Sequence, residues 1–205
     1  MSPSSAVVIL PVKPPAVGKS RLVSIPVARR ELAAAFALDT AAAALAAPRV
    51  TAVLALTDDH LFADELAGVG CIVLPDPVDG DLNGSLRQGA AEVRRRWPDA
   101  RPAALCADLP ALLPEDLDAA LAVMLGRPGP SFVADTEGTG TVLYSASLED
   151  FDPRFGTGSA DAHALGGADA VPGDLPTLRR DVDDGPALAA ATRLGLGART
   201  RALLH

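Results

Sequence analysis

The stretch Ala6-Val-Val-Ile-Leu-Pro-Val-Lys-Pro-Pro-Ala-Val-Gly-Lys-Ser-Arg-Leu22 opens the chain and decides its fold class. The unbroken apolar run from Ala6 to Leu10 is typical of a strand buried on both faces of a parallel sheet. A loop punctuated by Pro and Gly follows, and it carries Lys13, Lys19 and Arg21. In open α/β sheets, ligands bind beyond the carboxyl ends of the strands. The loop therefore indicates either a small polyanionic ligand or a solvated basic turn.

The rest of the chain alternates between apolar, strand-like runs and Ala/Leu-rich helical segments. This alternation predicts one α/β domain over residues 1–205, with a mostly parallel, mixed sheet flanked by helices. The Gly-containing turn at 135–138 predicts a hairpin, at which the simple alternation breaks. The predicted strands are 6–10, 50–56, 71–74, 103–107, 131–134, 140–144 and 175–182. The predicted helices are 26–47, 59–66, 81–97 and 114–125, one following residue 159, and a last one starting at Pro186.

The composition excludes several classes of partner. A net charge of −8 argues against a nucleic-acid polymer or an anionic membrane, because both require a broad basic surface. Mononucleotides remain allowed. No apolar run approaches a membrane span and the N-terminus lacks a signal-peptide pattern, so we expect a cytoplasmic protein. Cys71 and Cys106 lie in apolar contexts and are interpreted as small core residues.

Three aspartates follow predicted strands. Asp108 ends one apolar strand, while Asp181 and Asp183 flank Val182 at the end of another. In extended chain, residues i and i+2 share a face, so two carboxylates would point the same way beside a third. Such a set suits Mg²⁺, and a site of this kind can hold two ions. The alternative is a strand-end turn at Asp108 and a solvated acidic cluster at 181–184.

A second candidate anion site lies in Phe155-Gly-Thr-Gly-Ser-Ala-Asp-Ala-His163. Gly156, Gly158 and Ser159 precede a predicted helix, where successive backbone N–H groups can hold a phosphate. Thr141 could add a hydroxyl. The alternative is an ordinary capped helix. His163 would share a helix face with Ser159, although a lone histidine is more often a structural hydrogen-bonding group.

One apparent motif is excluded. Gly18-Lys-Ser20 matches the end of a Walker A loop, but that motif requires glycine where this chain has Lys13. Pro14 and Pro15 also remove two of the N–H donors that such a loop uses. A P-loop fold is therefore not expected.

Taken together, these segments resemble the guanylyltransferases of coenzyme F-420 biosynthesis, which act on 2-phospho-L-lactate or phosphoenolpyruvate and have a Rossmann-like nucleotidyltransferase (GT-A-like) fold. The resemblance spans nearly the whole chain, and the segment from Phe155 to His163 is its most specific part. The matching segments are Leu10-Pro-Val-Lys13, Lys19-Ser-Arg-Leu22, Asp81-Leu-Asn-Gly84, Ala107-Asp-Leu-Pro110, Gly140-Thr-Val-Leu143, Phe155–His163 and Arg180-Asp-Val-Asp183.

The resemblance implies a role for each matching residue. Asp108, Asp181 and Asp183 would bind two Mg²⁺ ions, and Thr141, Gly156 and Ser159 would hold the phosphate of the three-carbon acid. Lys19 and Arg21 would be catalytic. The residues implied to bind the nucleotide are Pro11, Lys13, Lys19, Arg21, Asn83 and Ser85, with the last two near the base or ribose.

The implied reaction transfers GMP from GTP to phosphoenolpyruvate, giving enolpyruvoyl-2-diphospho-5'-guanosine and pyrophosphate. With 2-phospho-L-lactate the product would be lactyl-2-diphospho-5'-guanosine. Phosphoenolpyruvate is preferred because the Arg- and Ala-rich composition resembles that of actinobacterial members. Another nucleotidyltransferase, of sugar-1-phosphate or molybdopterin type, and a non-catalytic nucleotide-binding regulator remain alternatives. The sequence does not indicate an oligomeric state.

Overall fold

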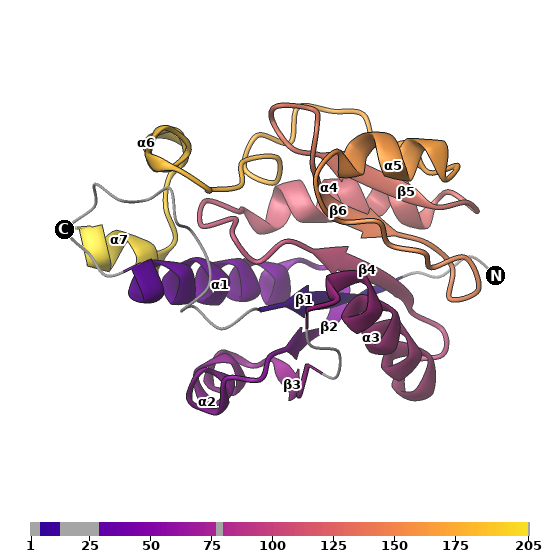
Figure 1. Ribbon diagram of the computed structural model, residues 1–205, viewed down its shortest axis with the longest axis horizontal. Coiled ribbons are helices and arrows are strands. Elements are labelled where there is room, and N and C mark those ends of the chain that lie inside the picture. The colour runs from indigo at the N-terminus through magenta and orange to yellow at the C-terminus, as the bar shows by residue number, and fades with distance from the viewer. Residues whose placement is uncertain (1–4, 13–28, 77–79, 205) are drawn as a thin grey trace.

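The computed structural model describes residues 5–12, 29–76 and 80–204, and one mixed sheet runs through these parts of the chain (Figure 1). The strands are β1 (Ala6–Pro11), β2 (Val50–Leu56), β3 (Ile72–Leu74), β4 (Arg101–Leu105), β5 (Ser131–Ala134), β6 (Thr141–Ser145) and β7 (Asp169–Ala170). The helices are α1 (Arg29–Ala46), α2 (His60–Val69), α3 (Leu82–Arg96), α4 (Pro114–Leu125), α5 (Ser159–Leu165), α6 (Gly185–Leu194) and α7 (Ala198–Leu204).

The strand order in the sheet is β3-β2-β1-β4-β6-β5-β7. Strands β3, β2, β1 and β4 are parallel, whereas β6 runs antiparallel to both β4 and β5. β1 lies inside the parallel part, and its residues 6–10 are completely buried. This confirms the interpretation of the opening apolar run as a strand covered on both faces.

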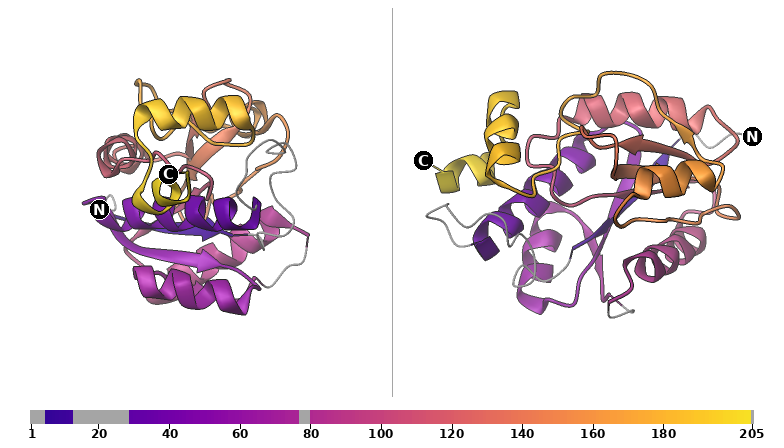
Figure 2. Two further views of the ribbon diagram at one scale, coloured as in Figure 1. Left: turned by 90° about the vertical axis from the view of Figure 1, so that its left-hand side faces the viewer. Right: turned by 45° about the horizontal axis from the view of Figure 1, so that its top comes forward.

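Helices cover both faces of the sheet (Figures 1 and 2). Val8 and Leu10 of β1 belong to one hydrophobic cluster with α1 and α4, while Val7 and Ile9 belong to a second cluster with α3 and α5. Successive β1 side chains therefore pack in opposite layers, as the period of a strand requires. In Figure 1, α6 and α7 lie at one end of the molecule near α1, where Leu32 and Phe36 contribute to a third cluster.

The sequence of strands across the sheet changes direction between β1 and β4, which are neighbours and parallel. The candidate site lies at the carboxyl ends of these two strands. β6 begins at this same edge, because Leu143 pairs with Leu105, the last residue of β4. The Cys106 N–H then donates to the carbonyl of Val142 at 2.9 Å. Antiparallel β6 thus brings its first residue, Thr141, to the edge from which the chain leaves β4 toward Asp108.

Most predicted elements are confirmed, but the strand predicted at 175–182 is wrong. That segment has turns and no strand, and β5 pairs instead with β7, which the sequence did not indicate. Side chains hold the segment: Asp116 accepts from the Thr177 N–H at 2.9 Å and its hydroxyl at 2.6 Å. Arg179 donates to the carbonyls of Ala134 and Val171. The last predicted helix is in fact two helices, α6 and α7.

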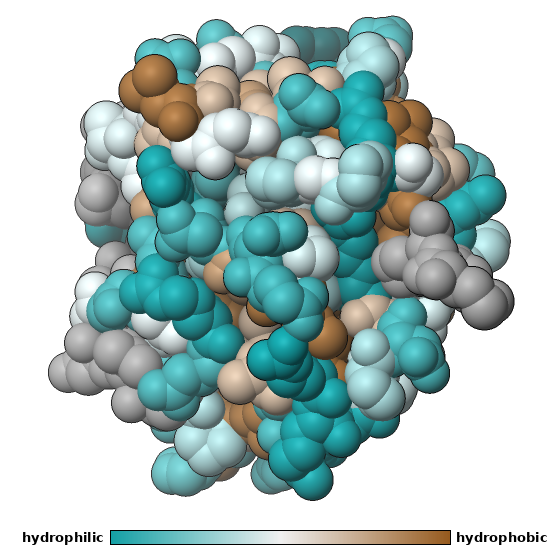
Figure 3. Space-filling model, turned by 90° about the vertical axis from the view of Figure 1, so that its right-hand side faces the viewer, coloured by the Kyte–Doolittle hydropathy of each residue, from teal (hydrophilic) through white to brown (hydrophobic). Residues whose placement is uncertain are grey.

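Three smaller features complete the description. Cys71 is a buried thiol, as predicted, whereas Cys106 is half-buried and its Sγ donates to the carbonyl of Thr141 at 3.3 Å. Figure 3 shows one face on which hydrophilic residues predominate and apolar residues lie between them. Within residues 5–12, 29–76 and 80–204, no helix is both long and apolar enough to span a bilayer.

Candidate active site

The aspartates predicted to bind metal lie beside one another in the backbone. Asp108 follows β4, and its carbonyl accepts a hydrogen bond of 3.0 Å from the N–H of Val182. Val182 is completely buried, while Asp181 is half-buried and Asp183 is exposed. The 181–183 segment is not a strand, but it is extended enough that Val182 points into the core and its two neighbours do not. The backbone of Asp108 therefore lies next to the 181–183 segment although the predicted strand is absent.

Asp181 and Asp183 line an acidic cavity between the β5–β6 turn and the start of α6. The other charged residues that line this cavity are Asp135, Glu137, Arg180 and Asp184. Arg180 makes an ion pair of 3.3 Å with Glu137 across this cavity. Carboxylate oxygens are the ligands that Mg²⁺ prefers, so the residues present suit that ion. Within the described parts of the chain, no three or more His, Cys, Asp or Glu side chains already converge as a metal-binding group. The metal assignment stays a prediction.

Thr40 of α1 holds the turn that contains Asp108. Its hydroxyl accepts from the Leu109 N–H at 3.1 Å and lies 3.4 Å from the carbonyl of Ala107. The same hydroxyl is 2.8 Å from the carbonyl of Phe36 in its own helix, and Thr40 is completely buried. Thr40 on one side and Val182 on the other therefore fix the backbone on both sides of Asp108.

The predicted phosphate-binding residues come together at the start of α5. Gly156 and Gly158 have φ of +140° and +70°, which only glycine adopts without strain, and both are exposed. Ser159 is 2% exposed and Thr141 is 5% exposed. The Ala160 N–H donates to the carbonyl of Thr139 at 3.2 Å, which attaches α5 to the β5–β6 turn. Because Thr139 also lines the acidic cavity, the phosphate loop and that cavity are neighbours.

Asp135 shapes the β5–β6 turn, which contacts both the acidic cavity and the start of α5. Its carboxylate accepts from the N–H groups of Thr139 at 2.9 Å and Gly140 at 2.7 Å. A Cβ at position 140 would collide with this carboxylate, so any other residue there would have to displace the Asp135 side chain. Asp135 is thus a turn-forming residue, and it fixes the turn that precedes Thr141, the first residue of β6.

His163 is buried beneath the phosphate loop. Its Nδ1 lies 2.9 Å from Thr141 Oγ1, and its Nε2 accepts from the backbone N–H of Arg154 at 2.9 Å. The ring stacks on Tyr144, with centroids 4.6 Å apart, and on Phe132 at 5.8 Å. Burial lowers the pKa of His163 to about 4, so the imidazole is neutral near pH 7. This residue carried little weight in the sequence, yet both of its ring nitrogens have hydrogen-bond partners.

Asn83 and Ser85, predicted to lie near the base or ribose, have structural contacts of their own. Asn83 makes two hydrogen bonds with the backbone of Phe155. Ser85 is completely buried, its hydroxyl donates to Asp76, and the same hydroxyl lies 3.0 Å from the carbonyl of Asp81. A direct contact of Ser85 with a nucleotide would require Ser85 to become accessible. Their nucleotide-binding roles stay predictions.

Of the remaining predicted nucleotide residues, Pro11 is half-buried at the carboxyl end of β1, the edge toward which Asp108 and Thr141 face. Lys13, Lys19 and Arg21 lie outside the described residues. The sequence analysis missed Thr40 and Asp135 as site-building residues. No local signal marks Thr40, since it lies within an ordinary Ala-rich helix, whereas Asp135 was recognised only as part of a turn.

The fold has well-defined structural neighbours. A crystal structure described as a nucleotide-diphospho-sugar transferase, from Desulfovibrio desulfuricans G20, superposes with a TM-score of 0.70 over 97% of this chain and 93% of the other, at 16% identity. A 4-diphosphocytidyl-2C-methyl-D-erythritol synthase superposes with a TM-score of 0.61 over 93% of this chain and 98% of that protein, at 10% identity. At these identities the likeness establishes the Rossmann-like nucleotidyltransferase fold. No family model matches the chain.

Sequence relatives decide the family. A phosphoenolpyruvate guanylyltransferase of Salinispora arenicola is 48% identical over 202 residues, covering 96% of this chain and 92% of the relative. One of Geodermatophilus obscurus is 44% identical over 204 residues, covering 96% and 93%. The chain belongs to the phosphoenolpyruvate guanylyltransferase family. Membership of this family makes the protein an enzyme of the nucleotidyltransferase type and confirms the resemblance seen in its motifs.

Proposed function

We propose that this enzyme transfers GMP from GTP to phosphoenolpyruvate, in an Mg²⁺-dependent reaction of coenzyme F-420 biosynthesis. The products are enolpyruvoyl-2-diphospho-5'-guanosine and pyrophosphate. One observation carries the proposal: the phosphate half of the site and its acidic half share a single sheet edge. The Cys106 bond to Val142 and the Val182 bond to Asp108 hold Thr141 and the aspartates at that edge.

The proposed chemistry needs positioning more than proton transfer. A phosphate oxygen of phosphoenolpyruvate attacks the α-phosphorus of GTP, the bond between that phosphorus and the α–β bridging oxygen breaks, and pyrophosphate leaves. The attacking phosphate is already anionic near pH 7, so no general base is required. The chain has to hold two polyanions in line and reduce their repulsion.

Each half of the site has a part in that task. Thr141, Ser159 and the exposed backbone around Gly156 would bind the acceptor phosphate. Asp108, Asp181 and Asp183 would hold Mg²⁺, which supplies the positive charge that lets an anionic nucleophile approach an anionic triphosphate. The proposed triphosphate contacts and the catalytic roles of Lys19 and Arg21 rest on the motif resemblance.

The test is a pyrophosphate-release panel with Mg²⁺. GTP, ATP and CTP are each combined with phosphoenolpyruvate, 2-phospho-L-lactate, 3-phosphoglycerate and a sugar 1-phosphate. The expected result is fastest release with GTP and phosphoenolpyruvate. Faster release with 2-phospho-L-lactate would mean that this compound is the acceptor instead of phosphoenolpyruvate. Release only with a sugar 1-phosphate would identify another type of nucleotidyltransferase. GTP binding without release for any acceptor would indicate a non-catalytic regulator.

A further inference from the structure

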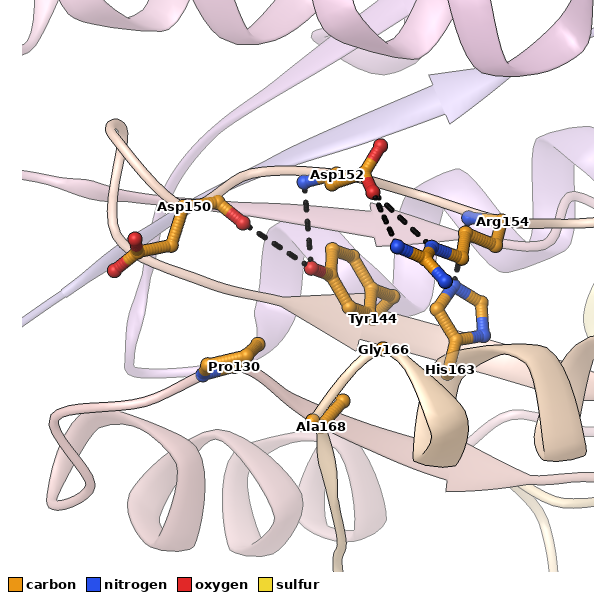
Figure 4. Close-up of a pocket in the computed structure, with 9 residues that line it drawn as sticks. Pro130, Tyr144, Asp150, Asp152, Arg154, His163, Gly166 and Ala168 are labelled. Carbon is orange, nitrogen blue, oxygen red and sulfur yellow. Dashed lines mark hydrogen bonds and ion pairs between the residues drawn. The ribbon is translucent and has the colours of Figure 1, made fainter.

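The hydrogen bonds of His163 determine which of its ring nitrogens carries the proton. A backbone N–H can only donate, so the N–H of Arg154 requires that Nε2 be the unprotonated acceptor (Figure 4). A neutral imidazole has one N–H, and it must therefore lie on Nδ1.

This tautomer sets the direction of the Thr141 hydroxyl. Nδ1–H donates to Thr141 Oγ1 across 2.9 Å, so the hydroxyl cannot send its own proton to the ring. Its O–H must then point to another acceptor. The imidazole cannot rotate to relax this arrangement, because Tyr144 and Phe132 stack on it and Phe155 meets it edge-on at 5.4 Å.

We propose that His163 is a positioning residue that keeps the Thr141 hydroxyl directed as a hydrogen-bond donor toward the phosphate of the acceptor. This inference rests on the proposed function and adds to it a residue that does not itself touch substrate. The neutral ring suits this task, since burial holds the pKa of His163 at about 4 and the tautomer stays the same throughout the neutral range. His163 thereby connects the backbone of Arg154, just before the Gly156–Ser159 loop, to Thr141 at the start of β6.

The test separates acceptor binding from nucleotide binding. His163→Phe keeps an aromatic ring in the stack but removes both polar atoms, whereas His163→Asn can place an amide N–H near the position of Nδ1. We expect His163→Phe to raise KM for phosphoenolpyruvate at least tenfold, with KM for GTP changed less than twofold, and His163→Asn to restore part of the loss. His60→Phe, at the exposed first residue of α2, is the matched control and should behave as wild type.

A double-mutant cycle identifies the route of the effect. If His163 acts through Thr141, His163→Phe added to Thr141→Val should raise KM for phosphoenolpyruvate no further than Thr141→Val alone. The inference would be overturned if the KM increases of the two single variants multiplied in the double variant, or if KM rose equally for both substrates. Should His163→Phe fail to fold, the cycle is run with His163→Asn, and ¹⁵N NMR of wild type, which has 3 histidines, must show a protonated Nδ1.

Failure of the proposed function has a different signature. A wild-type enzyme that releases no pyrophosphate with phosphoenolpyruvate would contradict the function, whichever variant is made. The positioning role is then measured with inorganic phosphate as the probe, in the presence of GTP. Weaker phosphate binding by His163→Phe than by wild type would support the role of His163, and equal binding would overturn it.

Discussion

Asn83 and Phe155 lie 72 residues apart and hold each other by two reciprocal hydrogen bonds. The Asn83 amide donates to the Phe155 carbonyl at 3.0 Å, and its oxygen accepts from the Phe155 N–H at 2.8 Å. Asn83 is in the first turn of α3, whereas Phe155 immediately precedes the glycine loop. One side chain therefore connects the helix predicted to approach the nucleotide with the loop predicted to bind the acceptor.

Asn83→Ala should loosen this connection. Removing the amide leaves the backbone groups of Phe155 without these partners, so the loop loses a fixed position. We expect KM for phosphoenolpyruvate to rise about tenfold, equivalent to roughly 1.4 kcal/mol of binding free energy. Gln88→Ala, on the exposed side of the same helix, is the control. Steady-state kinetics with an unchanged KM in Asn83→Ala would show that the loop holds its position without this bridge.

Replacing the carboxylates tests the metal assignment. Asp181→Asn combined with Asp183→Asn keeps the size of both side chains and removes two negative charges. We expect pyrophosphate release to fall at least a hundredfold and Mn²⁺ binding, followed by calorimetry, to weaken in parallel. Asp174→Asn, exposed and outside the acidic cavity, is the matched control. Full activity of the double variant, or activity that survives EDTA, would contradict metal binding at these positions.

Thr40→Val tests how the Asp108 turn is supported. Valine has the shape of threonine but leaves the Leu109 N–H without its acceptor, at a cost of about 1–3 kcal/mol for a buried group. We expect a lower midpoint in urea unfolding and weaker Mn²⁺ binding. Thr192→Val is the control, because that hydroxyl bonds only the carbonyl of Leu188 within its own helix. A variant with lowered stability but unchanged Mn²⁺ affinity would leave Thr40 a purely structural residue.

His163 should make stability depend on pH in mildly acidic solution. Its pKa is lowered to about 4 in the folded protein by burial, against the ordinary 6.5 of the unfolded chain, so the unfolded state binds more protons between these values. Stability from this group is complete above pH 6.5 and is lost as the pH falls toward 4, by up to about 1.4 kcal/mol per pH unit. Urea unfolding of wild type and His163→Phe over this range gives the comparison. Parallel curves for the two proteins would contradict the shift.

Gly89 and Gly68 should respond in opposite directions to substitution by alanine. Both lie inside helices, α3 and α2, but a Cβ at Gly89 would approach Ile9 Cγ2 of β1 to 2.8 Å, whereas a Cβ at Gly68 would meet nothing within 4 Å. Gly89→Ala should destabilise the protein by about 1–3 kcal/mol through overpacking. Gly68→Ala should stabilise it by up to about 1 kcal/mol. Thermal unfolding checks both, and a stabilised Gly89→Ala would show that α3 can shift away from β1.

Local sequence patterns were enough to predict the parallel half of the fold and the family. The run from Ala6 to Leu10 was apolar enough to require a strand buried on both faces, and the order of short motifs from Lys13 to Asp183 indicated the guanylyltransferase family, which the relatives confirm. These features are local, because burial and phosphate chemistry select residue types at fixed spacings. The predicted extent of one domain, the cofactor and the individual site residues stay predictions.

The contacts that hold the site together join segments that are distant in sequence. The 175–182 segment appeared strand-like in sequence, yet Asp116 and Arg179 hold it outside the sheet, and β7 pairs with β5 instead. The contacts from Thr40 to the Asp108 turn, from Asn83 to Phe155 and from His163 to Thr141 connect residues 69, 72 and 22 positions apart. Hydrogen bonds between distant segments depend on the path of the backbone. A histidine within a helix therefore gave no sign in the sequence that its ring would fix the direction of a threonine hydroxyl.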